Sequence, residues 1–158
     1  MAYKSVTALL LFLSLAACGD PLENQLYQNN GPTNLTVRQT AAEAGFMSLG
    51  ATSIAVYQET AEDCVFDFVG TIKVKSGSQT AALPPGHRFA LRLNFNDQDF
   101  LGSTTNGSQI VRLFTPRAGH QYDFQMAIQH RGLDYSLFDV TNGQRRLVNM
   151  PALLAVCH

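Results

Sequence analysis

The four histidines are the side chains best suited to metal binding or proton transfer, and their spacing limits what they can do. They are His87, His120, His130 and His158, and no two of them form an H-x-H or H-E-x-x-H pattern. Zinc sites usually need such spacing to bring imidazoles together, so the sequence predicts no metal site and no cofactor. His87 and His120 each follow a turn containing proline and glycine. We expect either two surface turn residues or a pair that meets at one end of the fold.

Nucleophilic and acid–base chemistry has no recognisable arrangement in this chain. No serine lies in a G-x-S-x-G sequence, which would indicate a nucleophile elbow. Asp67 and Asp123 alternate with apolar residues, which predicts that both face solvent. Glycoside cleavage would need two carboxyl groups held across a cleft. We therefore expect a protein without enzymatic activity.

Arginines on the expected strands are the remaining candidates for binding. Arg88 and Arg92 share one face of a strand, and Arg112 lies on the next strand. Two interpretations stay open: a small cationic patch, or pairing of each arginine with polar neighbours across the sheet. Phe100 lies in a polar loop, and loops on a rigid scaffold often contact partners. The candidate binding residues are therefore His87, His120, Phe100, Arg88 and Arg92.

The chain begins with the features of an exported protein. Residues 8–17 are mostly apolar, Lys4 precedes them, and no acidic residue comes before Asp20. Such a run is too short to cross a bilayer core of about 30 Å as a stable helix, and it has the layout of a signal peptide. Its end, Leu-Ala-Ala-Cys at 15–18, resembles the lipobox of bacterial lipoproteins. The resemblance implies removal of residues 1–17 and lipidation of the Cys18 thiol. An ordinary signal peptide with a coincidental cysteine is the alternative.

Residues 18–34 are polar and rich in residues that break regular structure. We expect this segment to be a flexible tether between the lipidated cysteine and a folded domain over residues 35–158. In the enterobacterial lipoproteins that the segment resembles, Asp directly after the cysteine retains the protein in the inner membrane. Gly19 occupies that position here, and Asp20 follows. The resemblance therefore implies a lipid-anchored protein of the outer membrane that faces the periplasm.

If Cys18 carries the lipid, Cys64 and Cys157 remain as an even pair in an oxidising compartment. We expect a structural disulfide between them, because the C-x-x-C spacing typical of redox pairs is absent. Two buried thiols, or a redox pair of another kind, are the alternatives. The bond would close a loop of about 94 residues and contribute on the order of 4 kcal/mol to stability.

Short strands must position all of these residues. Large apolar residues occupy every second position from Phe89 to Phe95 and again from Tyr122 to Ile128, and the positions between them hold polar residues or alanine. Turn sequences recur roughly every twelve residues. This pattern predicts an all-β fold, an antiparallel β-sandwich of immunoglobulin-like or transthyretin-like type.

Particular residues predict local features of that sandwich. Lys75–Ser78 and Asn142-Gly143 are typical of hairpin turns. Gly70 interrupts an alternating run and indicates a bulge. We expect at most one short helix, over 40–49, and a final strand that reaches Cys157.

The charge balance excludes large classes of partner. One of the eleven Lys and Arg residues lies in the leader, which leaves ten against twelve acidic residues. Such a balance provides no strong field to attract nucleic acid. The leading hypothesis is a non-enzymatic, membrane-anchored lipoprotein that presents its sandwich to a protein partner of the envelope, as an assembly accessory, inhibitor or immunity protein. The alternative is an envelope lipoprotein that binds a small ligand, a glycan or a metal ion.

Overall fold

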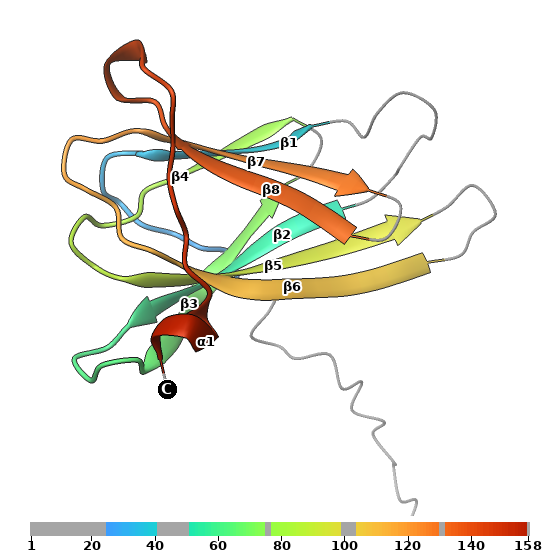
Figure 1. The fold of residues 1–158 in the computed structure, drawn as a ribbon, viewed down its shortest axis with the longest axis horizontal. Helices are drawn as coiled ribbons and strands as arrows, with labels where there is room; N and C mark the ends of the chain where they lie inside the picture. Colours follow the sequence, from blue (N-terminus) through green and yellow to red (C-terminus); the bar gives the residue numbers. More distant parts are fainter. Residues whose placement is uncertain (1–24, 41–50, 75–76, 99–103, 130–131, 158) are drawn as a thin grey trace, which may run out of the picture.

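A computed structural model describes residues 25–40, 51–74, 77–98, 104–129 and 132–157 (Figure 1). These residues form nine strands, a short 3₁₀ turn and one short α-helix. Their bounds are β1 (Leu35–Thr40), β2 (Ala51–Glu59), β3 (Phe66–Val74), β4 (Ser78–Ala81), β5 (Phe89–Gln98), β6 (Thr104–Phe114), β7 (Tyr122–Gln129), β8 (Gly132–Asp139), η2 (Thr141–Gly143), β9 (Arg146–Leu147) and α1 (Leu153–Val156).

The strands form two stacked sheets, which confirms the predicted all-β sandwich (Figure 1). One sheet has the order β4-β1-β7-β8-β9, and the other has the order β3-β2-β5-β6. Neighbouring strands are antiparallel except β1 and β7, which run parallel. In the immunoglobulin grouping the first and second strands share a sheet. Here β1 and β2 lie in different sheets, so the strand grouping differs from the immunoglobulin one.

The alternating faces of β5 and β7 fill the space between the sheets. Phe89, Leu91 and Leu93 of β5 have no exposed surface, and neither do Phe124 and Met126 of β7. Successive side chains of a strand point to opposite sides, so strict alternation sends every second residue into the core. The periodicity of the sequence therefore predicted these core residues correctly.

The first described residues lie against the edge of β3. The Tyr27 N–H donates to the carbonyl of Thr71 at 2.9 Å, and the Thr71 N–H donates to the carbonyl of Gln25 at 2.8 Å. Gly70 permits this approach, because a Cβ there would lie 2.5 Å from the Cα of Tyr27. The pairing of β2 with β3 shifts register opposite Gly70, which confirms the predicted bulge. Residues 25–27 of the expected tether therefore contact the domain.

The two expected hairpins have different outcomes. Asn142 and Gly143 both have positive φ, 57° and 74°, and they join the antiparallel strands β8 and β9 as predicted. The hairpin expected at 75–78 is wrong, because β3 and β4 lie in different sheets and β4 pairs with β1. The chain therefore passes from one sheet to the other between β3 and β4.

Residues 146–157, which we call the C-terminal strap, connect the two sheets (Figure 1). The strap begins as β9 beside β8. It then reaches the edge of β6, where the Leu113 N–H donates to the carbonyl of Pro151 at 2.9 Å and Ala152 forms a bridge with Arg112. It ends beside the loop between β2 and β3, where Cys157 is bonded to Cys64.

The end of the strap corrects the sequence prediction of a final strand. Residues 153–156 form one helical turn, α1, and the Cys157 N–H donates to the carbonyl of Leu153 at 2.9 Å. Pairing with β6 ends at Ala152, so the next backbone groups bond within the turn instead of across a ladder. The helix expected over 40–49 lies outside the described residues.

Candidate functional site

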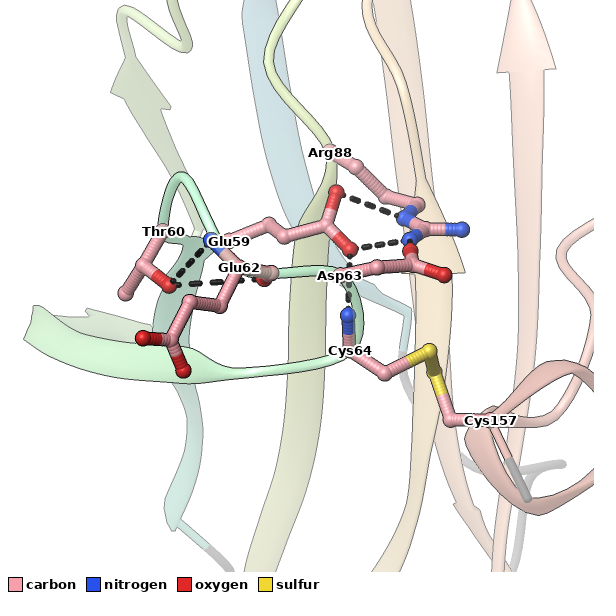
Figure 2. The surroundings of a disulfide bond; sticks show 7 residues. All are labelled: Glu59, Thr60, Glu62, Asp63, Cys64, Arg88 and Cys157. Carbon is pink, nitrogen blue, oxygen red and sulfur yellow. Dashed lines mark hydrogen bonds and ion pairs between the residues drawn. A yellow bond between two sulfur atoms is a disulfide. The ribbon is translucent and has the colours of Figure 1, made fainter.

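A disulfide fixes the end of the strap to the sandwich. The Cα atoms of Cys64 and Cys157 are 5.6 Å apart, and 93 positions separate them in the sequence. The predicted disulfide is therefore confirmed. Figure 2 shows this bond beside the side chains of Glu59, Asp63 and Arg88, and we call these five residues the disulfide corner.

Arg88 is held by two carboxylates at the disulfide corner. Its Nε donates to Glu59 at 2.8 Å, and its Nη2 donates to both Glu59 and Asp63 (Figure 2). Glu59 also accepts the N–H of Cys64 at 2.9 Å. The hydrogen bonds from Arg88 hold the pKa of the Glu59 carboxyl below its usual range, and the same bonds raise the pKa of Arg88. This ion pair therefore ties the start of β5 to the loop that carries the disulfide.

The disulfide corner brings together three side chains of kinds that bind metals. Ligand atoms of Glu59, Asp63 and Cys64 lie within 4.8 Å of one another. The sulfur of Cys64 is bonded to Cys157, however, and both carboxylates accept hydrogen bonds from Arg88. A thiolate is what binds metal, so the chemistry of these groups favours a structural ion pair over a metal site.

A cavity of about 590 Å³ opens between the strap and the end of the sandwich, and we call it the strap groove. Its walls come from the end of β6, the β6–β7 turn, β7, β8 and the strap itself. The lining residues are Arg88, Leu113, Phe114, Thr115, Arg117, His120, Tyr122, Asp139, Arg146, Leu147, Val148, Asn149, Pro151 and Val156.

Two aromatic rings lie at the inner side of the strap groove. Phe114 and Tyr122 are almost completely buried and pack edge to face, with ring centroids 4.8 Å apart. The Tyr122 hydroxyl accepts the N–H of Arg117 at 3.0 Å, which ties the β6–β7 turn to the start of β7. Aromatic pairs of this geometry pack favourably, so this wall of the groove is part of the core.

Asp139 and His120 form a hydrogen-bonded pair on another wall. The Nδ1 atom of His120 lies 2.6 Å from Oδ2 of Asp139. The other carboxylate oxygen accepts the Thr141 hydroxyl at 2.5 Å and the Thr141 N–H at 3.0 Å. The bonds from Thr141, aided by His120, lower the pKa of Asp139 from 3.8 to about 2. Asp139 is therefore ionised and already engaged at neutral pH.

The outer rim of the strap groove carries two arginines, Arg117 and Arg146, which we call the arginine rim. Arg146 donates to the amide oxygen of Gln144 at 2.6 Å. Within the described part of the chain, neither guanidinium contacts a carboxylate. Both arginines are exposed, and Leu147, which follows Arg146 and also lines the groove, is 72% exposed. The rim therefore combines unpaired positive charge with open apolar surface.

The predicted binding residues do not form one cluster. His87 contacts Gln58 of β2 at 3.2 Å, whereas His120 contacts Asp139 of β8. Their turns are nevertheless neighbours, since the Gly86 N–H donates to the carbonyl of Pro116 at 3.1 Å. Only one of the two histidines, His120, lines the strap groove.

The three arginines considered from the sequence each have a different neighbour. Arg88 pairs with Glu59 and Asp63, as described above. Arg92 bonds to Asn94 at 3.2 Å, and Arg112 bonds to the hydroxyl of Tyr135 and lies over its ring. The structure therefore favours separate pairing over a shared cationic patch. Cys18 and Phe100 lie outside the described residues.

Sequence reasoning missed most of the strap groove. Arg117 and Arg146 lie in or directly after turns, at Pro-Arg-Ala-Gly and Asn-Gly-Gln-Arg-Arg. Basic residues in turns are common on surfaces and gave no signal by themselves.

Comparisons with known proteins add no family to this description. No family model matches the chain, and neither a curated protein nor a solved structure matches it significantly. Among the described residues, no helix has the length and apolar character needed to span a membrane.

Proposed function

We propose that this protein is a non-enzymatic lipoprotein of the bacterial envelope, anchored through Cys18 in the outer membrane and facing the periplasm. In this proposal the strap groove is its contact site for a protein partner, and its role is that of an assembly accessory, inhibitor or immunity protein. The observation that carries the proposal is the arginine rim beside the exposed Leu147, in a groove whose strap is fixed by a disulfide.

The lipobox-like sequence and the disulfide support the location. Structural disulfides persist mainly in oxidising compartments such as the periplasm. Two or three acyl chains give stable anchoring, since each buried methylene contributes about 0.8 kcal/mol. Confinement to a membrane surface raises the effective concentration of a partner there. A modest affinity at the groove is then sufficient for function.

The edges of the sheets support a groove contact more than strand addition. The edge of β3 is bonded to residues 25–27, and the edge of β6 is bonded to residues 151–152. The edge strands β4 and β9 have four and two residues. A partner strand needs a longer free edge for a stable ladder, so the described edges offer it little.

A second candidate function is the binding of a small anionic ligand in the same groove. The volume of about 590 Å³ lies within the range of ligand sites, which spans roughly 300–1,000 Å³. Arg117, Arg146 and His120 would supply donors. The exposed Leu147 argues for the protein partner, because a small charged ligand gains little from an open leucine.

Crosslinking in intact envelopes tests the proposal. A photoreactive amino acid at position 147 should give a discrete protein adduct, and the same amino acid at the exposed position 79 of β4 should not. The adduct should weaken when Arg117 and Arg146 are both replaced by Gln. Absence of any protein adduct from position 147 would contradict the proposed contact.

The anchor has a separate test. Replacement of Cys18 with Ser should leave the leader uncut and the chain without lipid, as judged by mass spectrometry. Normal processing of Cys18→Ser would contradict the lipoprotein assignment while leaving the groove contact open to its own test.

A further inference from the structure

The charges that line the strap groove differ in what they already contact. Arg88 is paired with Glu59 and Asp63, and Asp139 is bonded to His120 and Thr141. These bonds satisfy both groups from within the chain. The two guanidiniums of the arginine rim are what remains, and within the described residues they lack a carboxylate. Guanidinium groups bind carboxylates by paired, charge-assisted hydrogen bonds.

Exposed apolar side chains also line the strap groove. Leu147 is 72% exposed and Val156 is 41% exposed, and both line the groove. Large aliphatic side chains gathered at a concave surface are typical of contact sites. An occupant that satisfies this surface must therefore carry both acidic and apolar groups.

The backbone beside the rim adds a third element of recognition. β9 is the last strand of its sheet, and it carries Arg146 and Leu147 next to each other. Its outer edge is free of a ladder partner in the described part of the chain. Two residues are too few for a stable added strand, but a short extended segment can bond to this edge for one or two residues while its side chains reach the groove.

We propose that the strap groove binds a short, extended, acidic peptide segment of the partner protein. Its carboxylates bind Arg117 and Arg146, and an apolar side chain of the peptide packs on Leu147. This inference rests on the proposed function and specifies the chemistry of its partner.

The test uses the full chain purified in detergent and an array of short synthetic peptides. The peptides combine one or two leucines with acidic, neutral or basic residues. Peptides with paired acidic residues beside a leucine should be retained best, and retention should fall as salt is raised. The double variant Arg117→Gln with Arg146→Gln should weaken retention by about tenfold or more.

Two further variants separate this site from general charge attraction. Arg38→Gln with Arg145→Gln removes the same charge from residues that do not line the groove, and it should change retention less than about twofold. Leu147→Ser keeps every charge and should weaken retention severalfold. All these side chains are exposed, so the variants should fold.

The outcomes are distinct from those of the crosslinking experiment. Equal retention of acidic and basic peptides, no retention at all, or an equal effect of the two double variants would overturn the acidic-peptide inference. A protein adduct at position 147 would still support the proposed function in that case. Loss of both the adduct and the retention would remove both proposals.

Discussion

The disulfide corner and the arginine rim use arginine differently, although Arg88 of the corner and both arginines of the rim line the same groove. At the corner, Arg88 donates to Glu59 and Asp63, and its side chain is 26% exposed. At the rim, Arg117 and Arg146 are exposed, and among the described residues neither meets a carboxylate. The same side chain is thus a structural tie in one place and an open donor in the other.

This difference shows that an arginine paired with carboxylates of its own chain has a structural role, whereas an arginine without such a pair remains available for binding. A partly buried arginine must find its carboxylates within the chain, because desolvation without a partner is costly. An exposed arginine has no such cost and stays available to a partner. Substitutions at the corner should therefore affect stability, and substitutions at the rim should affect binding alone.

Of the substitutions that test this comparison, removal of the disulfide should have the largest effect on stability. The double substitution Cys64→Ser with Cys157→Ser should lower the free energy of unfolding by about 4–5 kcal/mol, because a loop closed across 93 positions is released in the unfolded chain. Urea unfolding followed by circular dichroism measures it. Chemical reduction of the natural chain should give the same loss, and a loss below about 1 kcal/mol would contradict a restraining role for the bond.

Replacement of Arg88 should have the second-largest effect on stability. Arg88→Met leaves the Glu59 carboxylate, whose side chain is only 16% exposed, without its main partner. We expect a loss of about 1–3 kcal/mol, against a change within about 0.5 kcal/mol for Arg117→Met. Adding Glu59→Gln to Arg88→Met should recover part of the loss, because the unpaired charge is then removed. Equal effects of the two single substitutions would erase the distinction between corner and rim.

The sequence predicted features that depend on local pattern. Strict alternation identified the buried faces of β5 and β7, the Asn142-Gly143 turn identified the β8–β9 hairpin, and Gly70 identified the bulge. The pairing of Cys64 with Cys157 followed from the cysteine count once Cys18 was assigned to the anchor. Each of these predictions depends only on neighbouring residues or on a small set of candidate residues.

The features that the sequence did not predict depend on long-range placement. Turn residues at 75–78 show that the chain turns, but they do not show that β4 leaves the sheet of β3 to pair with β1. The strap groove needs β6, β8 and residues 146–157 together, so no single segment indicates it. Asp139 received no attention because its contact with His120 joins two strands' ends that lie 19 positions apart, and the local bonds from Thr141 alone indicate only a turn.

The Asp139 pair should make stability depend on pH. Its pKa is about 2 in the folded protein and 3.8 without these contacts, so its stabilisation is complete above pH 3.8 and is lost as the pH falls toward 2. Since this side chain is 21% exposed, we expect Asp139→Asn to cost about 1–2 kcal/mol at pH 7. Unfolding of the natural protein and of Asp139→Asn should show a gap in unfolding free energy at pH 7 that closes near pH 2. A gap that stays constant with pH would assign the effect to packing.

The smallest predicted effect is the most specific to the arginine rim. Arg146→Gln removes a charge that makes no ion pair in the described chain, lies beside Arg145 and faces Asp139 across the β8–β9 ladder. The repulsion from Arg145 and the attraction to Asp139 oppose each other, so at low salt the substitution should change stability by no more than about 0.5 kcal/mol, and this change should disappear near 1 M salt, where screening acts within about 3 Å. Arg145→Gln is the matched control, because the Arg145 guanidinium lies 3.8 Å from the centre of the Phe138 ring. Loss of that contact should destabilise by about 0.5 kcal/mol at both salt concentrations.

Thermal unfolding measures both variants. A cost above about 1 kcal/mol for Arg146→Gln would mean that the rim is itself a structural tie, and it could then no longer be assigned to a partner.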